Sequence, residues 1–309
     1  MRLFRGVDDV PDEFGPSAVT IGKFDGVHSG HRAVIAELCR AAGAEGLESV
    51  AITFDRHPFA LHRPDAVPAA LVGLEQKLEL LEGTGVGATL VLRYDEKLAS
   101  LTPEQFVRDV LVEALRARVV LVGSDFRFGA GNAGDVGTLR ELGERHGFRV
   151  HLIDDVLVGD GRRVSSTWIR GMLEEGDVAE ASRLLGHVPT VRGVVVHGAK
   201  RGHELGFPTA NLSADCEGYI PADGVYAGWL VDGDERFPAA ISVGDNPTFE
   251  GVPQKQVEAH VLDRDLDLYG HTVEIEFVQR IRGMVAFSGV GPLIAQMGED
   301  VEQVRRILG

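Results

Sequence analysis

The sequence predicts two folds in succession: an α/β domain built on an open parallel sheet, then an antiparallel β-barrel with a terminal helix. In the first part, apolar strand-like runs alternate with helix-like runs, which favours a parallel sheet with right-handed crossovers. From Val191 on, short strand-like runs follow one another between turn signals, which is typical of a small barrel. The alternation of strand-like and helix-like runs ends before His187–Pro189, which resembles a linker. We therefore expect one domain at residues 1–186 and a second at residues 187–309.

The first domain is expected to alternate strands and helices. The strands are Ala18–Ile21, Ser49–Phe54, Thr89–Leu92, Arg118–Val122 and Arg149–Ile153. The helices are Arg32–Ala42, Leu74–Leu81, Pro103–Leu115 and Val136–His146. Thr102 is a good N-cap for the third helix, with Pro103 at its first position and Gln105 in support. A further helical pattern follows Arg170 and is expected to break near Gly176.

The second domain is expected to consist of strands and one closing helix. The strands are Val191–His197, Gly224–Val231, Arg236–Val243, Gln256–Leu262 and Thr272–Phe277. The helix is Pro292–Leu308, whose apolar residues form one stripe.

Composition narrows the function classes. A net charge of −16 disfavours a broad nucleic-acid surface and means that an anionic ligand needs local positive groups. No apolar run approaches the roughly 20 residues that a membrane span needs, and the N-terminus does not resemble a signal peptide. Cys39 and Cys216 lie far apart without metal-ligand spacing, so we expect a reducing cytoplasm.

The stretch Gly22–His31, GKFDGVHSGH, lies between the first strand and the first helix. His28 and His31 are three residues apart, so they share a face at the first turn of that helix. A helix N-terminus favours phosphate, and two imidazoles there can hydrogen-bond phosphoryl oxygens during transfer. The structural alternative is a Gly-rich turn with two surface histidines. The spacing His-x-Gly-His in this context favours a phosphate site.

Three further loops are expected at the same edge, because ligands bind at the carboxyl ends of parallel strands. Thr53–Pro58 either contributes to a site or is a plain exit from the second strand. In Gly123–Gly129, Phe126 and Phe128 either belong to the core or line a pocket for a planar ligand. The hydroxyls of Val164–Arg170 either cap the next helix or, with its arginine, hold a polyphosphate; the upstream histidine pair favours the second alternative.

Gly129–Gly134 reads GAGNAG and matches the GxGxxG pattern of dinucleotide-binding folds. That fingerprint belongs directly after the first strand of its unit, whereas a long turn intervenes here. We therefore reject a dinucleotide-binding fold.

The stretch Gly202–Asn211, GHELGFPTAN, carries the chemistry of the second domain. Thr209 and Asn211 present two neutral oxygens, which can join phosphate oxygens and water around Mg²⁺. Upstream, Gly198 and Lys200 belong to a basic, glycine-bearing loop suited to phosphates. A Pro-containing link between strands is the alternative.

Glu258 is expected in the middle of a strand, where a carboxylate is disfavoured. It is either an exposed strand residue or a base at the mouth of the barrel. An alcohol that attacks a γ-phosphate benefits from a carboxylate that accepts its proton.

Taken together, these motifs resemble the bacterial bifunctional riboflavin kinase/FAD synthetase family over nearly the whole chain and in family order. In the first part the resemblance rests on GKFDGVHSGH, TFDRHP, GSDFRFG and VSSTWIRGMLEEGDVAEASRLLG. In the second it rests on GHELGFPTANL, PADGVYAGW, ISVGDNPTF, VEAHVLD, DLYG and VEIEFVQRIRGMVAF. His-x-Gly-His is shared by a large nucleotidyltransferase superfamily, whereas the PTAN segment with a downstream Glu is much more specific to riboflavin kinases.

The resemblance implies a Rossmann-like nucleotidyltransferase domain and a riboflavin kinase barrel. The barrel would phosphorylate riboflavin with ATP and Mg²⁺ to give FMN, and the first domain would adenylylate FMN with a second ATP to give FAD and pyrophosphate. The implied adenylyltransferase residues are Gly22, Phe24, His28, Gly30, His31, Ser166, Thr167 and Arg170, the two histidines being catalytic. The implied kinase residues are Gly198, Lys200, Gly202, Thr209 and Asn211, with Thr209 and Asn211 on Mg²⁺ and Glu258 as the base. Candidates for flavin contact are Phe54, Asp55, Asp125, Phe126 and Phe128.

One departure and two alternatives accompany this interpretation. Family members often have Gly-Arg where this chain has Gly202-His203, and His lacks the permanent charge and fork of Arg. One alternative is a nucleotidyltransferase with a single activity and a barrel that only binds flavin. The other is a flavin-binding protein without catalysis.

Overall fold

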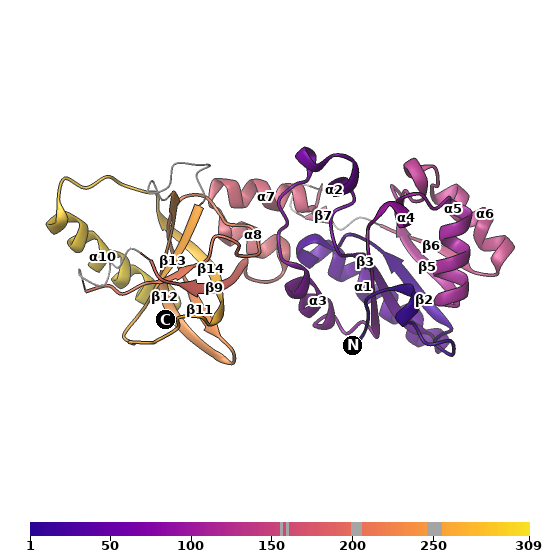
Figure 1. Cartoon of the computed structure of the whole chain (residues 1–309), viewed down its shortest axis with the longest axis horizontal. Coiled ribbons are helices and arrows are strands. Elements are labelled where there is room, and N and C mark those ends of the chain that lie inside the picture. Colours follow the sequence, from indigo (N-terminus) through magenta and orange to yellow (C-terminus); the bar gives the residue numbers. More distant parts are fainter. Residues whose placement is uncertain (155–156, 159–160, 199–205, 246–254) are drawn as a thin grey trace. The chain divides into compact units, whose positions relative to one another are not determined.

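The computed structural model describes the chain except residues 155–156, 159–160, 199–205 and 246–254. The chain forms two compact units (Figure 1). The first comprises Met1–Pro68 and Leu74–Val164, and the second comprises Ala69–Gly73 and Ser165–Gly309. Each unit is described by itself.

The first unit contains a six-stranded parallel sheet in the order β1-β4-β3-β2-β5-β6. Its strands are β1 (Arg2–Phe4), β2 (Ser17–Ile21), β3 (Glu48–Phe54), β4 (Ala88–Leu92), β5 (Ala117–Gly123) and β6 (Arg149–Ile153). This confirms the predicted α/β class and adds β1, which sequence analysis missed. After β2, the next two strands along the chain, β3 and β4, lie on one side of β2, whereas β5 and β6 lie on its other side. The strand order therefore reverses at β2, where open α/β sheets bind ligands.

Helices and short turns cover this sheet. They include α1 (Ser29–Glu45), α2 (Phe59–His62), α3 (Leu74–Glu82), α4 (Glu96–Ala99), α5 (Pro103–Phe106) and α6 (Val136–His146), while β7 (Leu157–Val158) pairs with β8 (Arg162–Arg163). Among the described residues, buried side chains form one cluster that includes Leu111 and Leu139 and another that includes Ile35 and Leu38. The expected helix Pro103–Leu115 starts with the predicted capping box at Thr102 but continues after α5 as a π-helix.

In the second unit, six antiparallel strands close into a barrel in the order β10-β13-β12-β11-β14-β9, which confirms the predicted barrel. The strands are β9 (Thr190–Val196), β10 (Ala210–Leu212), β11 (Gly224–Asp232), β12 (Glu235–Asp245), β13 (Lys255–Val261) and β14 (Thr272–Arg282). The fully buried rings of Tyr226 and Phe277 pack edge to face, 5.4 Å apart. Sequence analysis missed β10, which is the strand that carries Asn211.

Helices accompany the barrel in the described part of the second unit. They are α7 (Ser166–Glu175), α8 (Val178–Leu185) and α10 (Val290–Leu308). The break between α7 and α8 falls at Gly176, as predicted, where φ is +80°. Helix α10 buries Val301 and Val304 against the barrel, but Ile294 from the predicted stripe is 39% exposed.

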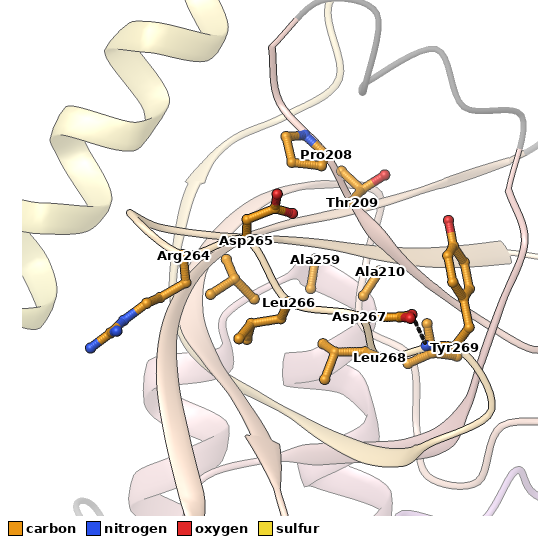
Figure 2. Close-up of a pocket in the computed structure, with 12 residues that line it drawn as sticks. Pro208, Thr209, Ala210, Ala259, Arg264, Asp265, Leu266, Asp267, Leu268 and Tyr269 are labelled. Carbon is orange, nitrogen blue, oxygen red and sulfur yellow. Dashed lines mark hydrogen bonds between the residues drawn. The ribbon is translucent and has the colours of Figure 1, made fainter.

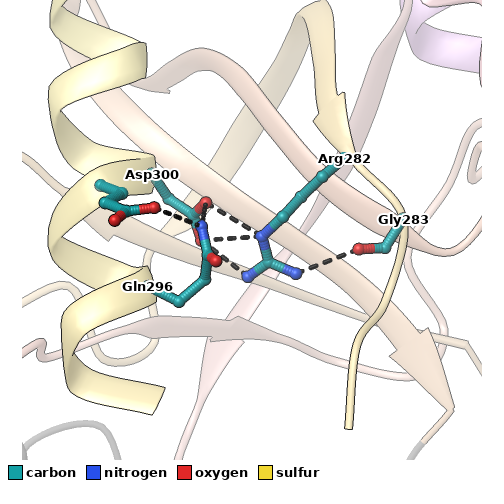
Figure 3. A network of polar contacts seen from close by, with 5 residues as sticks. Arg282, Gly283, Gln296 and Asp300 are labelled. Atoms are coloured by element: carbon teal, nitrogen blue, oxygen red, sulfur yellow. Dashed lines mark hydrogen bonds and ion pairs between the residues drawn. The ribbon is translucent and has the colours of Figure 1, made fainter. Parts of the chain in front are cut away.

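An ion pair joins α10 to the end of β14 (Figure 3). The Arg282 guanidinium donates to both carboxylate oxygens of Asp300, at 2.9 Å from Nε and 2.7 Å from Nη2. Gln296 also donates to Asp300, and Arg282 Nη1 donates to the Gly283 carbonyl oxygen. Because the Asp300 side chain is only 5% exposed, this network contributes to the packing of α10 rather than to the solvated surface.

Candidate active sites

His28 caps α1 in the first unit. It has extended backbone geometry, and its Nδ1 accepts the backbone N–H of His31 at 3.3 Å. The cap satisfies one of the free N–H groups of the first helical turn. Because Nδ1 accepts, the proton of a neutral His28 ring resides on Nε2. The predicted helix began at Arg32, whereas α1 begins at Ser29 and so includes His31.

The two histidine rings lie in contact. They stack with centroids 3.6 Å apart and planes 16° from parallel. The buried Phe24 ring meets His31 edge to face at 5.2 Å. A Cβ at Gly22 would approach the Phe24 ring to 3.0 Å, and a Cβ at Gly30 would approach the His28 ring to 3.1 Å. The structure therefore brings the predicted residues of this loop together, and both glycines allow the close approach of the rings.

Both histidines are neutral at pH 7. Burial, followed by the charge of Arg163, lowers the pKa of His28 to about 4. Burial, followed by the charges of His28 and Lys23, lowers the pKa of His31 well below its usual value. The buried Nδ1 of His31 has no hydrogen-bond partner within the described residues. A neutral imidazole at a helix N-terminus still has one ring N–H that can donate a hydrogen bond to a phosphoryl oxygen.

The loop after β2 is tied to the end of β3. Thr53 Oγ1 donates to the Lys23 carbonyl oxygen at 3.1 Å, and Lys77 Nζ donates to the Phe54 carbonyl oxygen at 2.8 Å. The Lys23 ammonium lies 3.4 Å from Nε2 of His57. Sequence analysis missed Lys77, which lies on α3, because a lysine between apolar helix positions gives no signal of burial.

The candidate flavin residues lie on two loops of the first unit. The Phe54 ring meets Tyr94 edge to face at 5.6 Å, and Asp55 accepts the Tyr94 N–H at 2.8 Å. The Phe126 ring stacks on Phe128 at 5.4 Å. Phe128 is only 7% exposed and belongs to the core, so its ring offers little surface to a ligand. Asp125 pairs with Arg163 at 2.9 Å.

The predicted hydroxyl loop belongs to the second unit. Ser165 is the N-cap of α7 and accepts the Trp168 N–H at 3.3 Å, which is the capping alternative considered from the sequence. Ser166 and Thr167 follow in the first turn. Arg170 Nε donates to the Ala69 carbonyl oxygen at 2.7 Å.

The barrel brings Thr209, Asn211 and Glu258 together. Asn211 on β10 pairs in register with Glu258 on β13. Thr209 Oγ1 donates to Glu258 Oε2 at 3.4 Å, and Asn211 Nδ2 lies 3.1 Å from the Thr209 carbonyl oxygen and 3.3 Å from Oγ1. A Cβ at Gly198 would lie 2.5 Å from the Asn211 side chain, so a glycine is needed there. Lys200, Gly202 and His203 lie outside the described residues.

A cavity of about 270 Å³ adjoins Thr209 (Figure 2). Its walls consist of the residues just before β10, one residue each from β9 and β10, two from β13, and the segment 264–269: Val195, Pro208, Thr209, Ala210, Ala259, Val261 and residues 264–269. The Tyr269 ring on the wall packs against His197 with centroids 3.9 Å apart. His260 Nδ1 donates to the Pro208 carbonyl oxygen at 2.8 Å and so fixes the turn that presents Thr209. Of the three polar residues, Thr209 is the one that lines this cavity, which has room for a small ligand beside it.

Comparisons with known proteins identify the families that successive parts of the chain resemble. The FAD synthetase family profile matches residues 11–168, and the riboflavin kinase profile matches residues 185–308. The bifunctional riboflavin kinase/FMN adenylyltransferase of Escherichia coli K12 is 37% identical over 311 residues, covering 100% of this chain and 98% of the relative. The protein of the same name from Listeria monocytogenes is 36% identical over 289 residues, covering 93% of this chain and 91% of the relative.

A solved structure from Streptococcus pneumoniae, named as a macrolide-efflux protein, has the same fold. It superposes with a TM-score of 0.87 at 32% identity and covers 98% of both chains. Within the described residues of the present chain, no helix combines the length and apolar character needed to cross a membrane. The chain belongs to the family of bifunctional riboflavin kinases/FMN adenylyltransferases, with an FAD synthetase domain followed by a riboflavin kinase domain.

Proposed function

We propose that the two activities of this enzyme are carried out by the two residue sets described above. The stacked histidines serve adenylyl transfer from ATP to FMN, and Thr209, Asn211 and Glu258 serve phosphoryl transfer from ATP to riboflavin. The observation that supports this most directly is the register of Asn211 with Glu258, which brings residues 47 positions apart in the sequence into one polar cluster. The domain boundary at Gly186 is part of the proposal.

In adenylyl transfer, an oxygen of the FMN phosphate attacks the α-phosphorus of ATP, and the bond to the pyrophosphate breaks. The attacking oxygen is already anionic, so the site needs positioning and charge stabilisation more than a base. His28 can donate from Nε2 to a phosphoryl oxygen, because its Nδ1 is engaged by the His31 backbone. His31 lies stacked on it, with the first-turn N–H groups of α1 close by. Gly22, Phe24 and Gly30 hold this arrangement. For Ser166, Thr167 and Arg170, on helix α7 of the second unit, a role in triphosphate binding stays a prediction from the sequence.

In phosphoryl transfer, the terminal ribityl hydroxyl of riboflavin attacks the γ-phosphorus of ATP, and the bond to ADP breaks. A neutral hydroxyl must lose its proton as the new bond forms, so this site needs a base. Glu258 is proposed to accept that proton. The Thr209 hydroxyl, 3.4 Å from Glu258 Oε2, orients the carboxylate.

Mg²⁺ is proposed as the metal of the kinase site. The donor set fits it, since hydroxyl and amide oxygens with phosphate and water suit a hard cation that prefers octahedral oxygen ligation. Thr209 Oγ1 and Asn211 Oδ1 would hold the ion; Asn211 directs its Nδ2 to Thr209, which leaves Oδ1 for the ion. When bound, Mg²⁺ neutralises charge that builds on the transferred phosphoryl group.

The cytoplasm is proposed as the compartment. Both cysteines, Cys39 and Cys216, are free thiols, which suits a reducing environment.

Single-site variants test the assignment. His31→Ala is expected to abolish FAD formation from FMN while FMN formation from riboflavin persists. Glu258→Ala is expected to abolish FMN formation while FAD is still made from added FMN. The measurement is chromatography of flavins during turnover with ATP and Mg²⁺. Parallel loss of both activities in either variant would refute the assignment to separate sites, and normal kinase turnover of Glu258→Ala would refute the base.

A further inference from the structure

Lys77 is a half-buried lysine at the edge of the sheet where the histidine pair lies. Its Nζ donates to the Phe54 carbonyl oxygen at 2.8 Å and lies 3.5 Å from the Lys23 carbonyl oxygen. One side chain from α3 thus reaches the backbone at the ends of both β2 and β3. A lysine that turns its charge inward loses hydration, so such a position requires compensating groups.

Two carboxylates supply that compensation. Asp25 of the histidine loop and Asp55 after β3 both favour the charged form of Lys77. The positive charge of Lys77 also acts on His31. It is one of several positive charges that lower the pKa of the His31 ring. Lys77 is also linked to that ring through the backbone, because Lys23 immediately precedes Phe24, which packs on His31.

We propose that Lys77 is a positioning residue of the adenylyl-transfer site, whose ammonium group ties the loop after β2 to the end of β3 and places one positive charge beside the histidine pair. This inference rests on the function proposed for the first unit. It goes beyond it by naming a residue outside the His-x-Gly-His motif that both shapes the phosphate site and contributes to its field.

The pH dependence of the reaction separates the charge of Lys77 from its structural role. Burial, opposed by Asp25 and Asp55, lowers the pKa of Lys77 to about 8. A neutral amine still donates to the Phe54 carbonyl oxygen, so the tie to β3 survives deprotonation while the positive charge is lost. A purely structural lysine therefore predicts no decline in rate near pH 8, whereas the proposal predicts one.

The experiment measures kcat/KM for ATP in FAD formation from FMN between pH 6.5 and 9.5, because kcat/KM reports ionisation of the free enzyme. The proteins are the full-length wild type, Lys77→Met, Lys77→Arg and the matched control Lys97→Met, which removes an exposed lysine of α4. Kinase activity of the same samples is the internal control. We expect Lys77→Met to lose about 10- to 100-fold at pH 7, in line with a small misplacement of reacting groups. We expect the wild type to decline above pH 8 by on the order of tenfold per pH unit, as one ionisation predicts.

Lys77→Arg decides between charge and structure, because an arginine keeps its charge throughout this range. Its alkaline decline is expected to disappear, and Lys97→Met is expected to match the wild type. The proposal would be overturned if Lys77→Met kept the wild-type kcat/KM, or if kcat/KM of Lys77→Arg still declined above pH 8 as in the wild type. Either result would leave the function proposed for the first unit intact. Absence of FAD formation by the wild type itself would instead overturn the proposed function, and this proposal with it.

Discussion

Replacing Gly198 by alanine is expected to damage the kinase selectively. The backbone of Gly198 lies outside the left-handed region, so it accepts alanine, but the new Cβ would lie 2.5 Å from Cγ and Oδ1 of Asn211. Ordinary van der Waals contact begins near 3.4 Å, so the amide has to move by about 0.9 Å. Asn211 Oδ1 is the proposed Mg²⁺ ligand. A displacement of roughly 1 Å in a catalytic constellation can cost on the order of 100-fold in rate.

The assay follows FMN formation from riboflavin and FAD formation from added FMN in parallel. Gly198→Ala is expected to lose about 10- to 100-fold in the first and nothing in the second. Gly298→Ala is the matched control, because a Cβ there meets nothing within 4 Å and helix α10 gains a better helix former. If Gly198→Ala retains wild-type kinase kinetics, then Asn211 does not need its observed position and the proposed metal ligand is wrong.

Two further predictions concern stability. Asp300→Asn leaves the Arg282 charge without its partner and is expected to destabilise the second unit by roughly 3 kcal/mol, whereas Glu302→Gln, at an exposed pair with Arg305, is expected to cost far less. Both tryptophans, Trp168 and Trp229, belong to that unit, so urea unfolding followed by their fluorescence measures it, and a loss below about 1 kcal/mol in Asp300→Asn would contradict the packing role of the pair. The second prediction concerns His28, whose pKa is about 4 when folded and near 6.5 when unfolded. As the pH falls from 6.5 towards 4, the unfolded state binds a proton at His28 before the folded state does. The free energy of unfolding is therefore unaffected by His28 above pH 6.5 and falls by up to about 3 kcal/mol towards pH 4. Hydrogen exchange of α1 in wild type and His28→Gln measures this, and an identical pH dependence in both proteins would refute it.

Strong periodicity accounts for the parts of the fold that were predictable. The strand Arg149–Ile153 and the helix Val136–His146 have the predicted bounds, because alternation, the cap at Asp135 and Gly147 after the last turn are all local signals. The strands β1 and β10 were missed, since each has three residues and is stabilised by pairing with distant strands rather than by its own sequence. The assignment of Ala69–Gly73 to the second unit likewise depends on distant contacts, such as Tyr219 N to the Leu71 carbonyl oxygen at 3.2 Å.

The candidate sites divide in the same way. Sequence motifs singled out His28, His31, Thr209, Asn211 and Glu258, because their residue types suit phosphate chemistry and their motifs resemble a known family. Stacking of the two histidines and the register of Asn211 with Glu258 required the folded backbone. Lys77 gave no sequence signal, since its role depends on two carbonyl groups that the sequence does not show as neighbours.

The central claim is that two separate sites act in sequence on one flavin. Mixing His31→Ala with Glu258→Ala tests it most directly, because each protein lacks one site and FMN can diffuse between them. With riboflavin, ATP and Mg²⁺, neither variant alone is expected to make FAD. The mixture is expected to form FMN first and then FAD. A mixture that accumulates FMN without FAD, or forms neither product, would contradict the account.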